Sequence, residues 1–117
     1  MSTWDEDIFA DDVNVDFLDE LANLDDEDIV ESVSDACALA TNDNSVSEEE
    51  QRNALAAATI AAIWAGAPFS AGEIVSSYPF IRELAGSGSE ELNEQALELL
   101  EGVEEDYDLE AFIEALS

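Results

Sequence analysis

Apolar residues recur at helical spacing along most of the chain and predict an all-α fold. Val13, Phe17 and Leu21 follow one another in steps of four residues, Leu24 comes three residues later, and Leu18 lies beside them, so they form one apolar stripe on a helix. No stretch alternates apolar and polar residues over a length that predicts a strand. We expect a compact bundle of five to six short helices. The expected helices cover residues 11–24, 25–41, 47–65, 70–78, 89–103 and 108–116, with a further turn at 80–84.

The helix expected at about residues 48–65 differs from the others because its last three turns are apolar on all sides. Ser47 and Glu50 form a capping box at its start, and Gly66 and Pro68 are expected to end it. A helix that is apolar all round is usually buried at the centre of a bundle. We therefore expect the other helices to pack around this one.

The length of 117 residues suits one domain, which we take to span residues 1–117. Residues 1–10 are interpreted as an N-terminal strap, and residues 86–88, Gly-Ser-Gly, as a flexible connector. The longest apolar stretch, at residues 54–68, is shorter than the ~20 residues that span a bilayer. The start has no basic segment followed by an apolar one, and there is a single cysteine, so a cytoplasmic location is predicted.

Charge narrows the choice of partners. The chain carries 31 acidic residues against two arginines, and its formal net charge is −29. Such a surface is repelled by nucleic acid and by anionic membranes, which are polyanions, and it attracts cations and basic protein surfaces. We therefore expect a basic protein surface as the partner, no nucleic acid and no membrane. A second copy of the same chain, forming a homodimer, is a further candidate.

The acidic residues are concentrated at the two ends of the chain. Residues 1–31 hold thirteen of them, residues 32–89 seven and residues 90–117 eleven. Two acidic arms thus flank a weakly charged apolar middle.

Composition also removes most enzyme chemistry. The chain has no His, no Lys and one Cys, so a Ser-His-Asp triad, a Schiff base and a Cys/His zinc site are excluded. Paired carboxylates remain, but so acidic a surface brings many such pairs to a suitable distance by chance. We expect no enzyme activity and no cofactor.

Four acidic residues of the first expected helix are candidate ligands for a divalent cation. Asp12, Asp16, Asp19 and Glu20 lie three or four residues apart or adjacent, so several share a helix face, and hard cations bind several oxygen ligands. The alternative interpretation is an N-cap followed by a solvated helix face. The run at 25–28 lacks the spacing and the central Gly of an EF-hand.

Two aromatic residues near the start are candidates for an interaction site. Trp4 and Phe9 are of the type that anchors protein interfaces, although the strap alternatively folds back and packs them on the helices. Cys37 lies on an apolar helix face and is interpreted as a small buried hydrophobic residue. Arg52 and Arg82 are expected to pair with nearby acids.

Two segments resemble a known protein family. The first has a Trp, then a Phe, an acidic pair, and an Asp followed by an aromatic residue. In this chain these positions are Trp4, Phe9, Asp11-Asp12 and Asp16-Phe17. The second segment is the Ala-rich run at residues 54–66. Over about residues 1–85 the chain resembles the bacterial family called domain of unknown function 4259, although members usually have Gly where this chain has Ser2, Asp5 and Asp7. The resemblance implies a small helical domain and supplies no catalytic residue.

Three functional interpretations follow from the sequence. The first is a non-enzymatic interaction or regulatory module with an acidic docking surface. The second is a nucleic-acid mimic that occupies the basic groove of a DNA-binding protein, which requires dense and ordered carboxylates. The third is an acidic surface that reflects adaptation to high salt or divalent-cation binding rather than a specific partner.

Overall fold

The computed structural model describes residues 4–42, 47–67, 76–86, 88–102 and 109–116, apart from the side chains of residues 4, 5 and 42. Within these residues the chain forms seven helices and no strand, which confirms the all-α prediction. The helices are α1 (Trp4–Ala10), α2 (Asp12–Ala22), α3 (Asp26–Asn42), α4 (Glu48–Trp64), α6 (Phe80–Glu83), α7 (Glu90–Glu101) and α8 (Glu110–Leu116).

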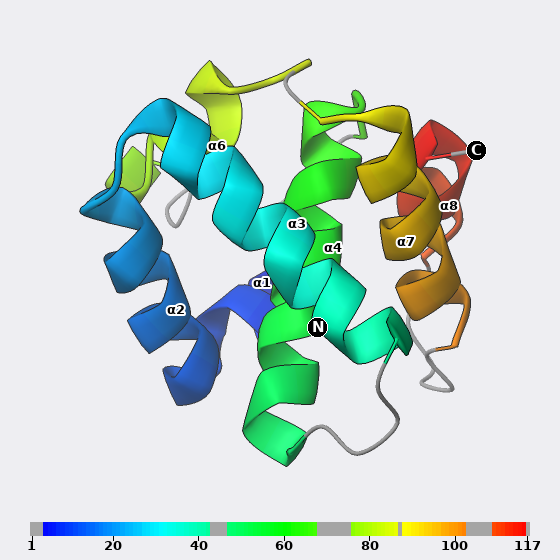
Figure 1. Ribbon diagram of the computed structural model, residues 1–117, viewed down its shortest axis with the longest axis horizontal. Helices are drawn as coiled ribbons and strands as arrows, with labels where there is room; N and C mark the ends of the chain where they lie inside the picture. Colours follow the sequence, from blue (N-terminus) through cyan, green and yellow to red (C-terminus); the bar gives the residue numbers. More distant parts are fainter. Residues whose placement is uncertain (1–3, 43–46, 68–75, 87, 103–108, 117) are drawn as a thin grey trace.

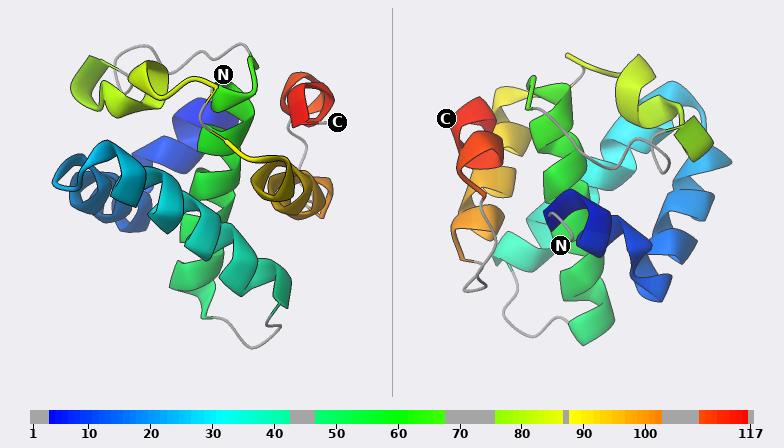
Figure 2. Two further views of the ribbon diagram at one scale, coloured as in Figure 1. Left: turned by 45° about the horizontal axis from the view of Figure 1, so that its top comes forward. Right: turned by 180° about the vertical axis from the view of Figure 1, so that it is seen from behind.

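Helix α4 passes through the middle of the molecule, and each of the other six helices packs against it (Figure 1). Helix α3 crosses in front of α4, while Figure 2 shows α1 lying across its back. Helices α7 and α8 pack on each other at one side, and α2 lies at the other. The principal extents of 31 × 29 × 27 Å describe a nearly spherical bundle.

The central position of α4 follows from its sequence. Its residues from Ala56 to Trp64 are all buried, as is Ala54. Most are alanines, whose small side chains let neighbouring helices approach closely, while Ile60 and Ile63 fill the larger spaces. Thr59 is fully buried, and its hydroxyl donates a hydrogen bond to the Leu55 carbonyl of the same helix at 2.8 Å. The predicted central helix is therefore confirmed.

The ends of α4 carry the predicted signals. The hydroxyl of Ser47 accepts from the backbone N–H of Glu50 at 3.1 Å and donates to its carboxylate at the same distance. At the other end Gly66 adopts a φ of 110°, a left-handed conformation that favours glycine. Its N–H donates to the Ile63 carbonyl, and the N–H of Ala67 donates to the carbonyl of Ala62. This Schellman arrangement satisfies carbonyls that the helix would otherwise leave free.

Two other helices begin at side-chain caps within the expected range. Asp11 accepts from the N–H of Val13 at the start of α2, and Ser89 accepts from the N–H of Leu92 at the start of α7, both at 3.1 Å. Most of the helix expected at 70–78 lies within residues 68–75, and the expected cap residue, Asp108, lies within residues 103–108. Both segments lie outside the described residues.

Residues 4–10, interpreted from the sequence as part of a strap, form helix α1, and this helix packs on α4 and α2. This helix has only seven residues and buries only Ile8 and Phe9 among its described side chains, so its apolar repeat is too short to detect by spacing. Gly86, the first residue of the expected connector, adopts a φ of 86° and donates its N–H to the Trp64 carbonyl at 2.8 Å. No helix in the described part of the chain is long and apolar enough to cross a membrane.

The inward side of α2 also differs from the expected stripe. Leu18 and Leu21 are buried, but Leu24 is 39% exposed, and the third buried position of α2 is the polar Asn14. Leu24 lies beyond the end of α2, and Phe17 packs half-buried against the core, so the difference from the expected stripe is chiefly the burial of Asn14.

Candidate functional site

The four candidate cation ligands lie on the outer side of α2. Asp12, Asp16, Asp19 and Glu20 are all exposed. No group of three or more acidic or Cys side chains in the described part of the chain, which includes these four, is arranged to hold a metal ion. The structure therefore does not bring them together as a cation site. The alternative, a capped helix with a solvated face, matches Asp11 as the cap and these residues as the face.

One of the four, Asp19, instead accepts a hydrogen bond from a residue distant in sequence. The Tyr78 hydroxyl donates to Asp19 Oδ1 at 2.5 Å, across 59 residues of sequence. This hydrogen bond to Asp19 raises the pKa of Tyr78 to about 12, with smaller contributions from burial and from the negative charges of Asp19 and Asp16. The Tyr78 ring meets Phe80 edge-on, with ring centroids 6.2 Å apart.

The aromatic candidates near the start do not form an exposed pair. Phe9 is fully buried in the core between α1 and α4, so its ring is inaccessible to a partner in this conformation. The side chain of Trp4 lies outside the described residues. Cys37 is fully buried, and desolvation raises the pKa of its thiol to about 12, which keeps it protonated and unreactive.

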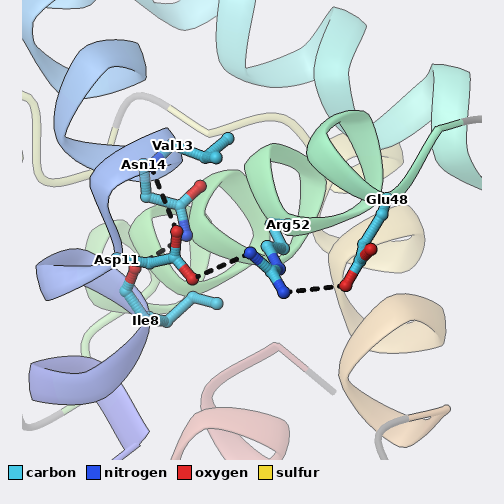
Figure 3. A network of polar contacts seen from close by, with 6 residues as sticks. All are labelled: Ile8, Asp11, Val13, Asn14, Glu48 and Arg52. Carbon is cyan, nitrogen blue, oxygen red and sulfur yellow. Dashed lines mark hydrogen bonds and ion pairs between the residues drawn. The ribbon is translucent and has the colours of Figure 1, made fainter.

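Arg52 lies in a polar network that ties the start of α4 to the junction of α1 and α2 (Figure 3). Its guanidinium contacts the Asp11 carboxylate at 3.5 Å and the Glu48 carboxylate at 2.7 Å. Its expected pairing with acids is thus confirmed. Arg82 is exposed and makes no ion pair with any described residue, contrary to expectation, so the only acids paired with an arginine in the described chain are those beside Arg52.

Asn14 is the residue of this region that sequence reasoning missed. It is fully buried, and its side-chain N–H donates to the Ile8 carbonyl at 2.7 Å, so it fastens the end of α1 to α2 (Figure 3). Its Oδ1 atom is buried without a hydrogen-bond partner. The only signal in the sequence is an Asn between two valines, Val13 and Val15, and this pattern does not distinguish a buried Asn from a solvated one.

The largest set of similar side chains on the surface is acidic. Helix α3 packs against both α2 and α7, so these three helices form a continuous layer on α4. Each helix turns apolar residues inward and carboxylates outward, as the spacing predicts. We call the exposed acidic residues of these three helices the acidic layer: Asp12, Asp16, Asp19, Glu20, Asp26, Glu27, Asp28, Glu31, Asp35, Glu90, Glu91, Glu94, Glu98 and Glu101.

The surface is hollowed between two helices of this layer. Residues 24–28, where α2 gives way to α3, line an open depression made of one leucine and four acids. Three of these acids, Asp26, Glu27 and Asp28, lie in the first turn of α3, where negative charge complements the helix dipole. Their position therefore has a structural reason without any ligand.

The comparisons with known proteins identify the family. Residues 2–114 match the family described as "Domain of unknown function (DUF4259)". The chain belongs to this family. The match extends beyond residues 1–85, to which the resemblance in the sequence is limited, and includes α7 and most of α8. No curated protein and no solved structure matches the chain.

Membership in DUF4259 does not bring a reaction or a ligand with it, since the family is defined without a function. The functional argument therefore depends on what the described residues can do chemically. They offer a rigid apolar centre, a set of exposed carboxylates, and few cations to neutralise them.

Proposed function

We propose that this DUF4259 protein is a non-enzymatic interaction module that docks on a basic protein surface through the acidic layer. The observation that carries the proposal is that the carboxylates of this layer are exposed and, within the described residues, unpaired with any arginine. Arg52 forms ion pairs with Asp11 and Glu48, and neither of these partners belongs to the layer.

Helix α7 illustrates how the layer is presented. Leu92, Ala96 and Leu100 anchor one side of the helix in the core. Its exposed glutamates therefore project from an anchored support, which limits the conformational entropy that binding must overcome. Like charges held close together repel, and pairing with a basic partner relieves that repulsion.

The test is affinity capture from a native cell extract, followed by measurement of direct binding to the captured protein. The bait is the full chain, and the informative variant is Glu94→Gln/Glu98→Gln, which removes two charges from the acidic layer. Its matched control is Glu49→Gln/Glu83→Gln, which removes two exposed charges elsewhere.

We expect a basic protein whose affinity falls with the α7 variant and is retained with the control. Rim charges act mainly on association, so the loss should be visible in the association rate and should shrink at high salt. Equal loss with both variants would indicate nonspecific attraction by net charge and would contradict docking through this layer.

A second candidate is mimicry of nucleic acid, supported by a row of exposed acids on each of α3 and α7, two helices that pack together. On α7 the exposed positions 91, 94, 98 and 101 follow in steps of three and four residues, so charges rise by about 5 Å each along the axis. One strand of duplex DNA carries a charge every ~3.4 Å. One row is thus sparser than a strand, and mimicry needs both rows.

Competition separates the two candidates. If the captured partner is a DNA-binding protein, added duplex DNA should displace it from the immobilised chain in proportion to its own affinity for DNA. A partner that stays bound at saturating DNA would contradict mimicry and leave the docking proposal in place.

A further inference from the structure

Tyr78 connects the segment before α6 to the acidic layer on α2. Its hydroxyl donates to Asp19 Oδ1 at 2.5 Å, and Figures 1 and 2 show this segment beside α2. The two residues are 59 positions apart in sequence, so the contact holds together parts of the chain that no local structure joins.

Helix α6 is short, and its core contacts come from Phe80, Ile81 and the following Leu84, while few polar contacts hold its first turn. It has four residues, and its N-cap, Pro79, makes no side-chain capping hydrogen bond. Phe80 and Ile81 bury their side chains, and the N–H of Gly86 anchors the far end to α4. At the near end the Tyr78 ring packs on Phe80, and its hydroxyl supplies the polar contact to α2.

The acceptor of this hydrogen bond is also a group that the proposed partner would seek. Asp19 is exposed within the acidic layer. A guanidinium forms charge-assisted, frequently bidentate hydrogen bonds with a carboxylate, which are stronger than those of a neutral hydroxyl. An arginine of the partner that pairs with Asp19 through both carboxylate oxygens draws negative charge away from Oδ1 and therefore weakens the hydrogen bond that Oδ1 accepts from Tyr78.

We propose that the Tyr78–Asp19 hydrogen bond is a latch that fastens the α6 segment to α2, and that a basic partner releases the segment by pairing with Asp19. The releasing step rests on the proposed docking function. The latch itself does not depend on that function, since it is a contact within the free protein. Docking on the acidic layer is thereby coupled to the mobility of a segment on its edge.

Hydrogen exchange of the full chain tests the latch without any partner. The reporters are the amides of Ile81, Arg82 and Leu84, which donate hydrogen bonds within this segment. In Tyr78→Phe, which keeps the ring and removes the hydroxyl, these amides should exchange about fivefold faster than in the wild type. Asp16→Asn is the matched control, because it removes a neighbouring charge and leaves the hydrogen bond intact.

Unchanged exchange in Tyr78→Phe would overturn the latch. Asp19→Ala provides a second variant that removes the acceptor instead of the donor, and it should accelerate the same amides. If both variants accelerated amides throughout the protein rather than these ones, the contact would serve global stability, and the proposal would also be overturned.

An oligoarginine peptide tests the releasing step, with binding followed by calorimetry and exchange measured on the same samples. Bound peptide should accelerate the α6 amides in the wild type and have no further effect in Tyr78→Phe, where the latch is already absent. Binding without acceleration would overturn release while leaving the docking function standing. Absence of binding would contradict the docking function. The exchange rates of Tyr78→Phe and the wild type without peptide would still show whether the latch exists.

Discussion

The buried half of α4 and the outer side of α7 are both helical surfaces, but they contribute to the protein in opposite ways. From Ala54 to Trp64 only Leu55 is not buried, and each buried apolar group removes surface from water. On α7 the exposed glutamates repel one another and contribute no burial. The comparison teaches that the fold is stabilised from its centre, while the surface carries charge at a cost in stability.

The most direct test of this comparison is to shorten a buried side chain of α4. Ile60→Ala should lower the free energy of unfolding by about 2–5 kcal/mol, because the fully buried site leaves a cavity. The midpoint of denaturant unfolding measures the loss. The comparison variant, Glu94→Gln on α7, should change the midpoint little, and an equal loss from both would show that α4 is not the core.

Cys37 and Tyr78, whose pKa values are both raised, allow the buried centre and the surface to be compared at alkaline pH. Burial raises the pKa of Cys37 to about 12 from 9.0, so the folded state holds this proton more tightly than the unfolded state. Its stabilising effect is therefore fully present below about pH 9 and is lost as the pH rises toward about 12. Cys37→Ala should reduce this alkaline loss in unfolding midpoints measured along a pH series.

Tyr78, which is half-buried and whose hydrogen bond to Asp19 is exposed, is the counterpart in the same pH series. Its pKa is raised to about 12 from 10.0 chiefly by the hydrogen bond to Asp19, so its contribution declines from about pH 10 upward. Because solvent screens this pair, Tyr78→Phe should alter the alkaline slope less than Cys37→Ala does. A larger effect from Tyr78 would mean that the thiol is more accessible than its burial indicates.

A smaller effect is expected where a polar group is buried. Asn14→Ala removes the donor to the Ile8 carbonyl at the α1–α2 junction and should cost about 1–3 kcal/mol. Asn23→Ala is the matched control, since the Asn23 side chain also donates to a backbone carbonyl, that of Asp19, but is exposed. Unfolding midpoints should separate the two variants. Equal values would show that burial adds nothing to the Asn14 contact.

The smallest effects concern the surface charge itself. Raising monovalent salt from 0.01 to 0.15 M shortens the screening length from ~30 Å to ~8 Å, so the melting temperature should rise. Glu94→Gln/Glu98→Gln should reduce this salt response slightly, with a change in stability within about 0.5 kcal/mol. A melting temperature that is independent of salt would contradict the idea that repulsion opposes the fold.

Much of the fold can be read from local sequence. The apolar residues around Ile60 predict a buried helix, Ser47 and Ser89 mark helix starts, and Gly66 marks an end. These signals act over three or four residues. A capping side chain and the backbone group that it binds are therefore already close in sequence. The all-α class, the central helix and the outward-facing acids of α7 follow from them.

The tertiary structure alone decided which side of α2 faces inward and which distant residues meet. Val13 is half-buried, whereas its polar neighbour Asn14 is fully buried and donates a hydrogen bond to the Ile8 carbonyl of α1. Tyr78 meets Asp19 because α6 and α2 both pack on α4, although 59 residues separate the two side chains. Periodicity gives the faces of a helix but not its rotation against neighbours, because that rotation depends on packing between segments that the local sequence does not relate.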